Sequence, residues 1–220
     1  MIPGKENLSV SFSVLTQKQL DKFIRVYQIP VFLNPKLPER NRAIYPFLTE
    51  KFAFYTQVCN FANYLVSFTK FLIKVLRFFR IHLSQMNPFG LSRINHYEIS
   101  CRALNRKLDL NVFRYFNEFI TTDVWYTFAY RKSVPSISSE EKSSLKNWKD
   151  HFFWLDDLCL PADLPWRFKD QSMDFDLKEN FIFDQVLAQN MVDNRSPIHP
   201  LPEHMLLLGR VSQIWSRGDG

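Results

Sequence analysis

The stretch NWKDHFFWLDD, residues 147–157, sets large apolar side chains among charged ones and decides what kind of fold the rest of the chain can build. A two-residue alternation puts Phe152 and Trp154 on one face of an extended segment, and the apolar residue after each of them on the other face. Apolar residues on both faces are typical of a strand that is covered on both sides. The stretch therefore predicts a buried strand over residues 151–156, with charged residues at its ends.

The same two-residue period recurs in VWYTFAYR, residues 124–131, which is rich in the aromatic and β-branched residues that favour strands. The polar residues 133–146 lie between the two candidate strands and are typical of an exposed loop. Strands that lie this close in sequence pair most simply as antiparallel neighbours. We therefore expect one small antiparallel pair, formed by residues 124–131 and 151–156.

Most of the remaining chain has the period of helices rather than strands. Over residues 64–83, apolar side chains repeat at intervals of three and four, and Lys70, Lys74 and Arg77 line the opposite side. This pattern predicts the clearest helix of the chain, a core helix with a basic face. The preceding residues 50–63 fit either a loop or a short helix.

Capping residues mark the other helices. Thr16 and Gln19 form a capping box, since each side chain can reach the backbone N–H of the other residue. Ser92 is placed to cap the helix after the turn NPFG, and Asp109 or Asn111 is placed to cap the next one. This last helix carries Phe113, Phe116 and Phe119, and further helices are expected over residues 16–27, 180–192 and 203–212.

Together these elements predict an α+β fold, a mainly helical single domain with a small antiparallel strand pair. The expected division is an N-terminal extension over residues 1–15, a single globular domain over 16–215 and a short tail over 216–220. Hydrophobic residues make up 46% of the 220 residues, and 22 of them are phenylalanines. This composition is enough to bury a core that is thick in aromatic rings.

The net charge and the cysteine content make some classes of protein more plausible than others. The net charge of +6 favours contact with polyanions without requiring it. Three cysteines without a CxxC pair argue against a disulfide framework and a zinc ribbon, and indicate a reducing, intracellular location. The N-terminus lacks the apolar run of a signal peptide, and four basic residues interrupt 64–83, so no membrane contact is expected.

Catalytic patterns are hard to find in the sequence. Phosphodiester chemistry on two metal ions requires converging carboxylates, and the candidates are Glu98, Asp123, Asp150, Asp156 and Asp157. Asp156 and Asp157 are adjacent and would point to opposite faces of a strand. Cys101 lies on the apolar side of its helix and does not face His96, which favours a buried, inert thiol. No P-loop, GxGxxG, GxSxG or zinc signature is present, so no catalytic residue, metal, cofactor or small-molecule ligand is assigned.

Several blocks occur in a fixed order along the chain: VLTQKQLDKFIRVYQIP, NFANYLVSFTKFLIKVLRFFRIHLSQMNPFGLSRINHYEISCRAL, FRYFNEF, WYTFAYRK and LKNWKDHFFWLDD. Over roughly residues 12–215 this order resembles plant proteins labelled as gypsy-type transposases, which are abundant in daisy-family genomes. The resemblance implies a retrotransposon-derived protein and suggests a nuclear location. It implies no catalytic residues, because the label records association with transposable elements. Members of the family continue beyond the point where this chain stops, so a truncated copy is one expectation.

The block over residues 64–104 also has the pattern of a helix-turn-helix, whose second helix presents basic and polar residues to DNA. Two consecutive helices are common in any helical domain, so a core helix with a solvated basic face competes with this interpretation. The leading hypothesis is a non-enzymatic assembly or interaction module, with self-association and nucleic-acid contact both open. The alternatives are a DNA-binding accessory protein of transposition and a metal-dependent nuclease. The candidate nucleic-acid contacts are Lys70, Lys74, Arg77, Arg93 and Arg102.

Overall fold

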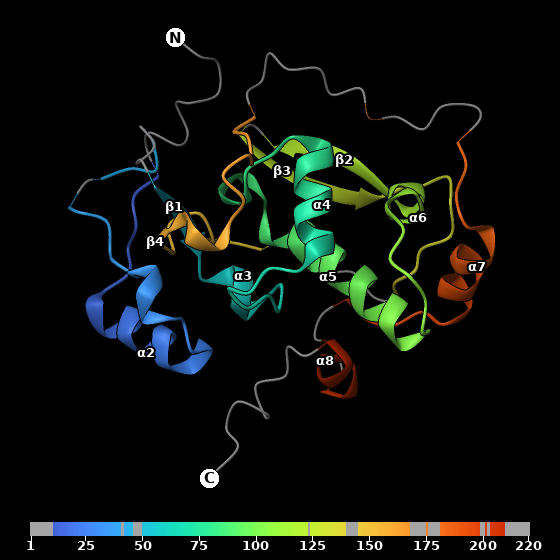
Figure 1. The fold of residues 1–220 in the computed structure, drawn as a ribbon, viewed down its shortest axis with the longest axis horizontal. Helices are drawn as coiled ribbons and strands as arrows, with labels where there is room; N and C mark the ends of the chain where they lie inside the picture. The colour runs from blue at the N-terminus through green and yellow to red at the C-terminus, as the bar shows by residue number, and fades with distance from the viewer. Residues whose placement is uncertain are drawn as a thin grey trace.

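Two small antiparallel sheets with helices packed around them form the fold, which confirms the predicted α+β class (Figure 1). One sheet and α2 (Gln17–Tyr27) lie toward one end of the molecule, and α7 (Gln185–Asp193) lies at the other end. The computed structural model describes residues 11–40, 42–45, 50–122, 124–139, 145–167, 175, 181–198, 201 and 203–209.

The first sheet joins β1 (Lys51–Tyr55) to β4 (Phe152–Asp156), with Phe54 opposite Phe153. All but the last residue of β4 are buried, so this strand is covered on both faces as the sequence predicts. Lys36 lies along the other edge of β4, where its backbone N and O each bond to Trp154 at 3.0 and 2.8 Å. The strand therefore has a backbone partner on each side.

The second sheet is the hairpin of β2 (Asn117–Thr122) and β3 (Trp125–Tyr130), in which Phe119 lies opposite Phe128. The predicted pairing of residues 124–131 with 151–156 is therefore wrong, although both segments are strands. A two-residue connection brings β2 and β3 together at once. Pairing with β4 would instead have required the chain to close the longer loop between them.

Two segments are strands where the sequence pattern pointed elsewhere. Phe119 continues the three-residue spacing of the preceding helix, but NEFITT is rich in residues that favour strands, and it forms β2. Residues 50–63 fitted a loop or short helix. The segment KFAFY in it is β1, and only the four residues after it, α3 (Gln57–Asn60), are helical. The buried strand β1 pairs with a partner that lies about 100 residues later, and β2 pairs with β3, which the helical spacing before it does not reveal.

Capping residues set the bounds of the helices α2 and α4 (Lys70–Phe79). The predicted capping box at α2 (Gln17–Tyr27) is confirmed, since Thr16 N donates to Gln19 Oε1 at 2.8 Å. The helix predicted over 64–83 is shorter, because α4 (Lys70–Phe79) starts at a Thr69 cap. It stops at Arg80, whose φ of 53° breaks the helical run.

The helix α5 (Pro88–Ala103) runs through the centre of the protein. Its cap is Asn87 rather than the predicted Ser92, so NPFG opens the helix instead of forming a turn before it. Asn87 Oδ1 accepts from Phe89 N at 2.8 Å, and proline is well suited to the first helical position because it needs no N–H partner there. Every residue from Pro88 to Cys101 is buried. Polar groups on this helix therefore need partners inside the protein.

Short elements complete the fold. Of the two predicted caps of α6 (Leu110–Phe116), Asp109 is the one that forms, since its side chain accepts from Asn111 N at 2.7 Å. Predicted helices at the C-terminal side appear as α7 (Gln185–Asp193) and α8 (Glu203–Gly209). Three 3-10 turns complete the described elements: η1 (Val31–Leu33), η2 (Leu83–Gln85) and η3 (Asp157–Cys159).

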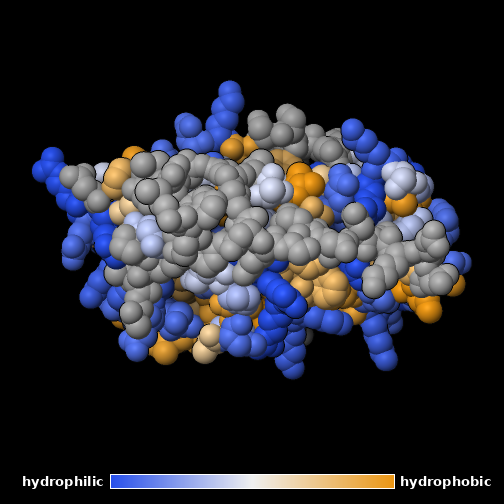
Figure 2. Space-filling model, turned by 90° about the horizontal axis from the view of Figure 1, so that it is seen from above, coloured by the Kyte–Doolittle hydropathy of each residue, from blue (hydrophilic) through white to orange (hydrophobic). Residues whose placement is uncertain are grey.

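Aromatic rings dominate the core, as the phenylalanine content predicts. Phe79 lies within 5.0 Å, centroid to centroid, of Phe119, Phe128 and Phe175. On the face seen in Figure 2, hydrophobic residues form small groups between hydrophilic ones. None of the helices in the described part of the chain is both long and apolar enough to cross a bilayer.

Of the two expected terminal segments, the structure describes only part of the N-terminal extension. Residues 11–15 of the expected extension run beside β4, where Ser13 Oγ donates to Phe152 O at 2.5 Å and Val14 N donates to Asp150 O at 2.8 Å. The rest of the extension, residues 1–10, and the expected tail, residues 216–220, lie outside the described residues.

Candidate functional site

Lys70 and Lys74 are exposed one turn apart on α4, on the side away from the core. Among the described residues neither lysine forms an ion pair. Arg77 continues this row, but its Nη2 lies 2.7 Å from Asp163 Oδ1 in an exposed ion pair. The following Phe78 is 37% exposed. We call Lys70, Lys74 and Phe78 the basic stripe. The Phe78 ring keeps an exposed edge, although the Arg114 guanidinium carbon lies 4.6 Å from its centroid.

Arg93 is buried, although the sequence made it a candidate for contact with nucleic acid. It is 8% exposed, and its Nη1 donates to the backbone carbonyl of Phe128 in β3. Its guanidinium carbon lies 4.7 Å from the centroid of the Tyr130 ring, where the cation meets the π face. This side chain holds α5 against β3 and is excluded from the candidate surface.

Arg102 is exposed at the end of α5, and its Nη2 lies 3.8 Å from Glu98 Oε2. The Glu98 side chain is only 1% exposed. Its Oε1 accepts from Tyr64 Oη and from Thr69 Oγ1, both at 2.7 Å. Because Thr69 also caps α4, this carboxyl group ties the start of α4 to the middle of α5. Burial raises the pKa of Glu98.

The two other groups with catalytic potential on α5 are also enclosed. His96 Nε2 lies 2.8 Å from Ser196 Oγ, and burial lowers the histidine pKa to about 4. Cys101 is buried as the sequence predicts, and burial raises its pKa to about 12. At neutral pH the imidazole is therefore uncharged and the thiol protonated. This is the state of packed core residues rather than of a nucleophile with its base.

The candidate carboxylates that the structure describes do not converge. Asp150 pairs with His151 at 2.6 Å between Oδ1 and Nδ1, Glu98 is enclosed on α5, and Asp123 lies outside the described residues. Throughout the described ranges, no three side chains of His, Cys, Asp or Glu come together as a metal would require. The two remaining candidates, Asp156 and Asp157, line a pocket at the end of the first sheet.

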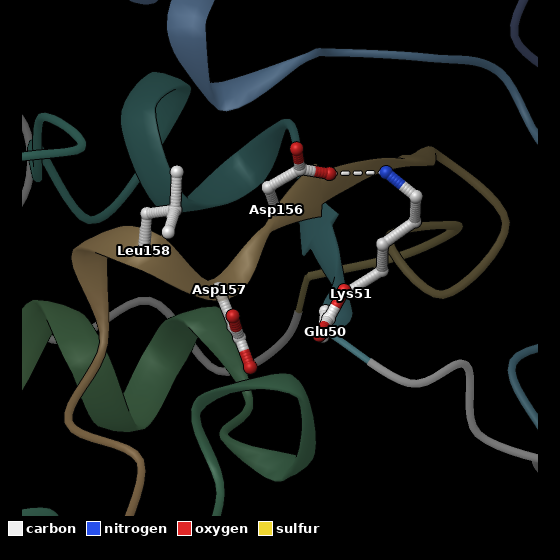
Figure 3. A pocket seen from close by; sticks show the side chains of 5 residues that line it. All are labelled: Glu50, Lys51, Asp156, Asp157 and Leu158. Carbon is white, nitrogen blue, oxygen red and sulfur yellow. Dashed lines mark hydrogen bonds and ion pairs between the residues drawn. The ribbon is translucent and has the colours of Figure 1, made fainter.

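This pocket has a volume of about 350 Å³ and is lined by Glu50, Lys51, Asp156, Asp157 and Leu158. Lys51 Nζ pairs with Asp156 Oδ1 across the β1–β4 register (Figure 3). The Asp156 and Asp157 carboxylates point to opposite sides of the chain, as their adjacency predicts. Among the described residues, the Glu50 and Asp157 side chains make no ion pair. We call Glu50 and Asp157 the acidic pair.

Large apolar side chains are exposed beside this pocket. Val31 is 84% exposed, Phe32 71% and Leu158 71%, and η1 and η3, which carry them, lie against each other. Leu33, which is buried, anchors η1 to the core. We call Val31, Phe32 and Leu158 the apolar tip.

Sequence reasoning missed the apolar tip. The one available signal was VFL between Pro30 and Asn34, three apolar residues in a segment that is otherwise typical of a connector. Nothing in that signal says that Leu158 lies beside it, because more than 100 residues separate the two turns.

Comparisons of the chain with protein-family models, with curated proteins and with solved structures gave no match.

Proposed function

We propose that this chain is a non-enzymatic assembly or interaction module, derived from a plant transposable element, that binds another protein through its apolar tip. The observation that carries the proposal is the exposure of Val31, Phe32 and Leu158 on adjoining turns. Single exposed apolar side chains are ordinary on any protein surface, but a group of large ones marks a contact region. The ordered sequence blocks, which resemble plant proteins labelled as gypsy-type transposases, support the origin from a transposable element.

Burial of the apolar tip would contribute useful binding free energy. A fully buried Val, Leu or Phe side chain contributes about 1.5–3 kcal/mol. Three such side chains supply the apolar centre that interfaces need, and the acidic pair beside them can form the polar rim. The short 3-10 turns and the buried Leu33 hold this centre in place before a partner arrives, so little ordering cost remains.

Selection from a displayed random peptide library tests this proposal. We expect the full chain to enrich a sequence family whose binding falls at least tenfold in the double variant Phe32→Ser, Leu158→Ser. Val186→Ser is the control, since Val186 is 63% exposed on α7, at the other end of the molecule (Figure 1). Enrichment that is unchanged in the double variant, or no enrichment at all, would refute the proposed role of the tip.

A second candidate function is nucleic-acid binding by a DNA-binding accessory protein in the nucleus. Lys70 and Lys74 on α4 favour it, because both are exposed and neither has an ion-pair partner within the described ranges. Contacts with phosphates release counterions, so such binding weakens steeply as salt rises. A mobility-shift assay over a salt series measures that slope.

The charge-reversed variant Lys70→Glu, Lys74→Glu should abolish the shift. Its control is Lys18→Glu, Lys22→Glu, an exposed pair with the same spacing on α2 and the same change of net charge. Equal loss in both variants would mean that only the overall charge acts, and a shift that survives in the α4 variant would exclude this face.

A further inference from the structure

The chain carries two exposed surfaces of opposite charge. The acidic pair lies beside Leu158 of the apolar tip, and Lys51 offsets only the third acid of the pocket, Asp156. The basic stripe lies on α4, where the exposed Lys70 and Lys74 precede the partly exposed Phe78 at intervals of four residues. Each surface combines two charges that have no ion-pair partner among the described residues with at least one exposed apolar side chain.

We propose that the partner of the apolar tip is a second copy of this chain, which docks its basic stripe against the acidic pair and the tip. This inference rests on the proposed function, because it names the occupant of the same surface. Lys70 and Lys74 would face Glu50 and Asp157, and Phe78 would cover Leu158.

The side chains of the stripe lie in one row along α4. Eight residues of α-helix span about 12 Å, so two lysines and an aromatic side chain are presented in one row. On the tip, charged and apolar groups are neighbours in the same way, since Leu158 directly follows Asp157 and lines the same pocket. Charge complementarity of this kind fixes orientation and excludes like-charged partners.

The stripe and the tip are different surfaces, so the contact is head-to-tail. A contact between two unlike surfaces leaves one of each free on every pair, and the copies close into a ring or extend as a chain. The contact is small and partly electrostatic. We therefore expect weak, salt-sensitive association, with a dissociation constant on the order of 10–100 µM.

Light scattering after size exclusion, over a range of protein and salt concentrations, tests the inference. The average mass should rise above the 26.3 kDa of one chain with protein concentration and return to it in high salt. Two variants, in which charged side chains are replaced by uncharged ones, each disable one of the two surfaces. The tip variant is Glu50→Gln, Asp157→Asn, Leu158→Ser, and the stripe variant is Lys70→Gln, Lys74→Gln.

Each variant alone should stay at the mass of one chain, because one of its two surfaces is disabled. An equimolar mixture should form a 1:1 pair and stop there, since the intact tip of one variant meets the intact stripe of the other. Lys18→Gln, Lys22→Gln is the control and should associate like the parent chain.

A parent chain that keeps the mass of one copy at every concentration would overturn the inference, and so would association that persists in either variant. Peptide enrichment that depends on Phe32 and Leu158, together with a single-copy parent, would leave the proposed function standing and remove only the second copy as its partner. A single-copy parent chain together with no enrichment that depends on Phe32 and Leu158 would refute both the self-association and the proposed function.

Discussion

Glu98 shows how one buried side chain can fix the positions of two helices. Its carboxyl accepts hydrogen bonds from Tyr64 and Thr69, and its second oxygen faces Arg102. Because burial raises its pKa, the charged form is disfavoured relative to water. By linkage, this group contributes stability below its unfolded pKa, and the contribution is lost as pH rises through the folded pKa.

Replacement of Glu98 separates its hydrogen bonds from its charge. Glu98→Ala should lower the free energy of unfolding by about 2–4 kcal/mol, because two hydroxyl donors lose their acceptor. Glu98→Gln keeps an acceptor of the same shape and should cost less than half as much. Urea denaturation at neutral pH measures both variants, and equal losses would show that the charge, rather than the hydrogen bonds, holds the helices.

At the level of single residues, local chemistry made some roles predictable. The Thr16–Gln19 capping box, the Asp109 cap and the buried Cys101 all follow from patterns within a few positions. Arg93 could not be assigned in this way. Phe89 on the same helix contacts its guanidinium, but the Phe128 carbonyl and the Tyr130 ring come from β3, which is remote from α5 in sequence.

Among the elements, helices were easier to predict than strand partners. A helix shows its own period, while β1 needs β4, about 100 residues later, to form its ladder. The helix α5 also escaped the usual pattern of one apolar face, because all its faces are buried. Its position against β3 depends on one small residue, Gly90.

Gly90→Ala tests how tightly α5 lies on β3. A Cβ atom at this position would meet Met86 Sδ at 2.7 Å and the Thr127 Cα at 3.0 Å. Alanine normally stabilises a helix interior by about 1 kcal/mol relative to glycine. Here we expect the opposite sign, a loss of about 1–3 kcal/mol from overpacking. A gain of stability on chemical denaturation would contradict this close approach.

For the whole molecule, the α+β class could be predicted from composition and periodicity, but the candidate surfaces could not. The row of lysines on α4 follows from helical spacing alone. The apolar tip and the acidic pair are assembled from η1, η3 and Glu50, the residue before β1, which meet only in the folded chain. Surfaces built from such distant segments carry no local signal.

The fold as a whole should lose stability in mild acid. Burial lowers the pKa of both His82 and His96 from 6.5 to about 4. The unfolded chain therefore binds more protons between these values, and each histidine removes about 2–3 kcal/mol as pH falls from 6.5 to 4. Glu98 offsets part of this loss, because its raised pKa acts in the opposite direction.

Two measurements check the acid effect. Urea midpoints at pH 7 and pH 4.5 should show the lower stability at the lower pH. Imidazole NMR signals of His82 and His96 should stay those of the neutral ring down to about pH 5. A signal from either residue that titrates near 6.5 would show that the ring is hydrated in the folded state.

The β1–β4 sheet also has a consequence during synthesis of the chain. Lys51 pairs with Asp156, so the first strand of this sheet leaves the ribosome 105 residues before its partner does. At about 5–20 residues per second, the apolar segment KFAFY waits roughly 5–20 s without a ladder. A bare strand of this kind is a site for pairing with other chains. Chaperone demand in the cell should therefore peak before β4 leaves the ribosome.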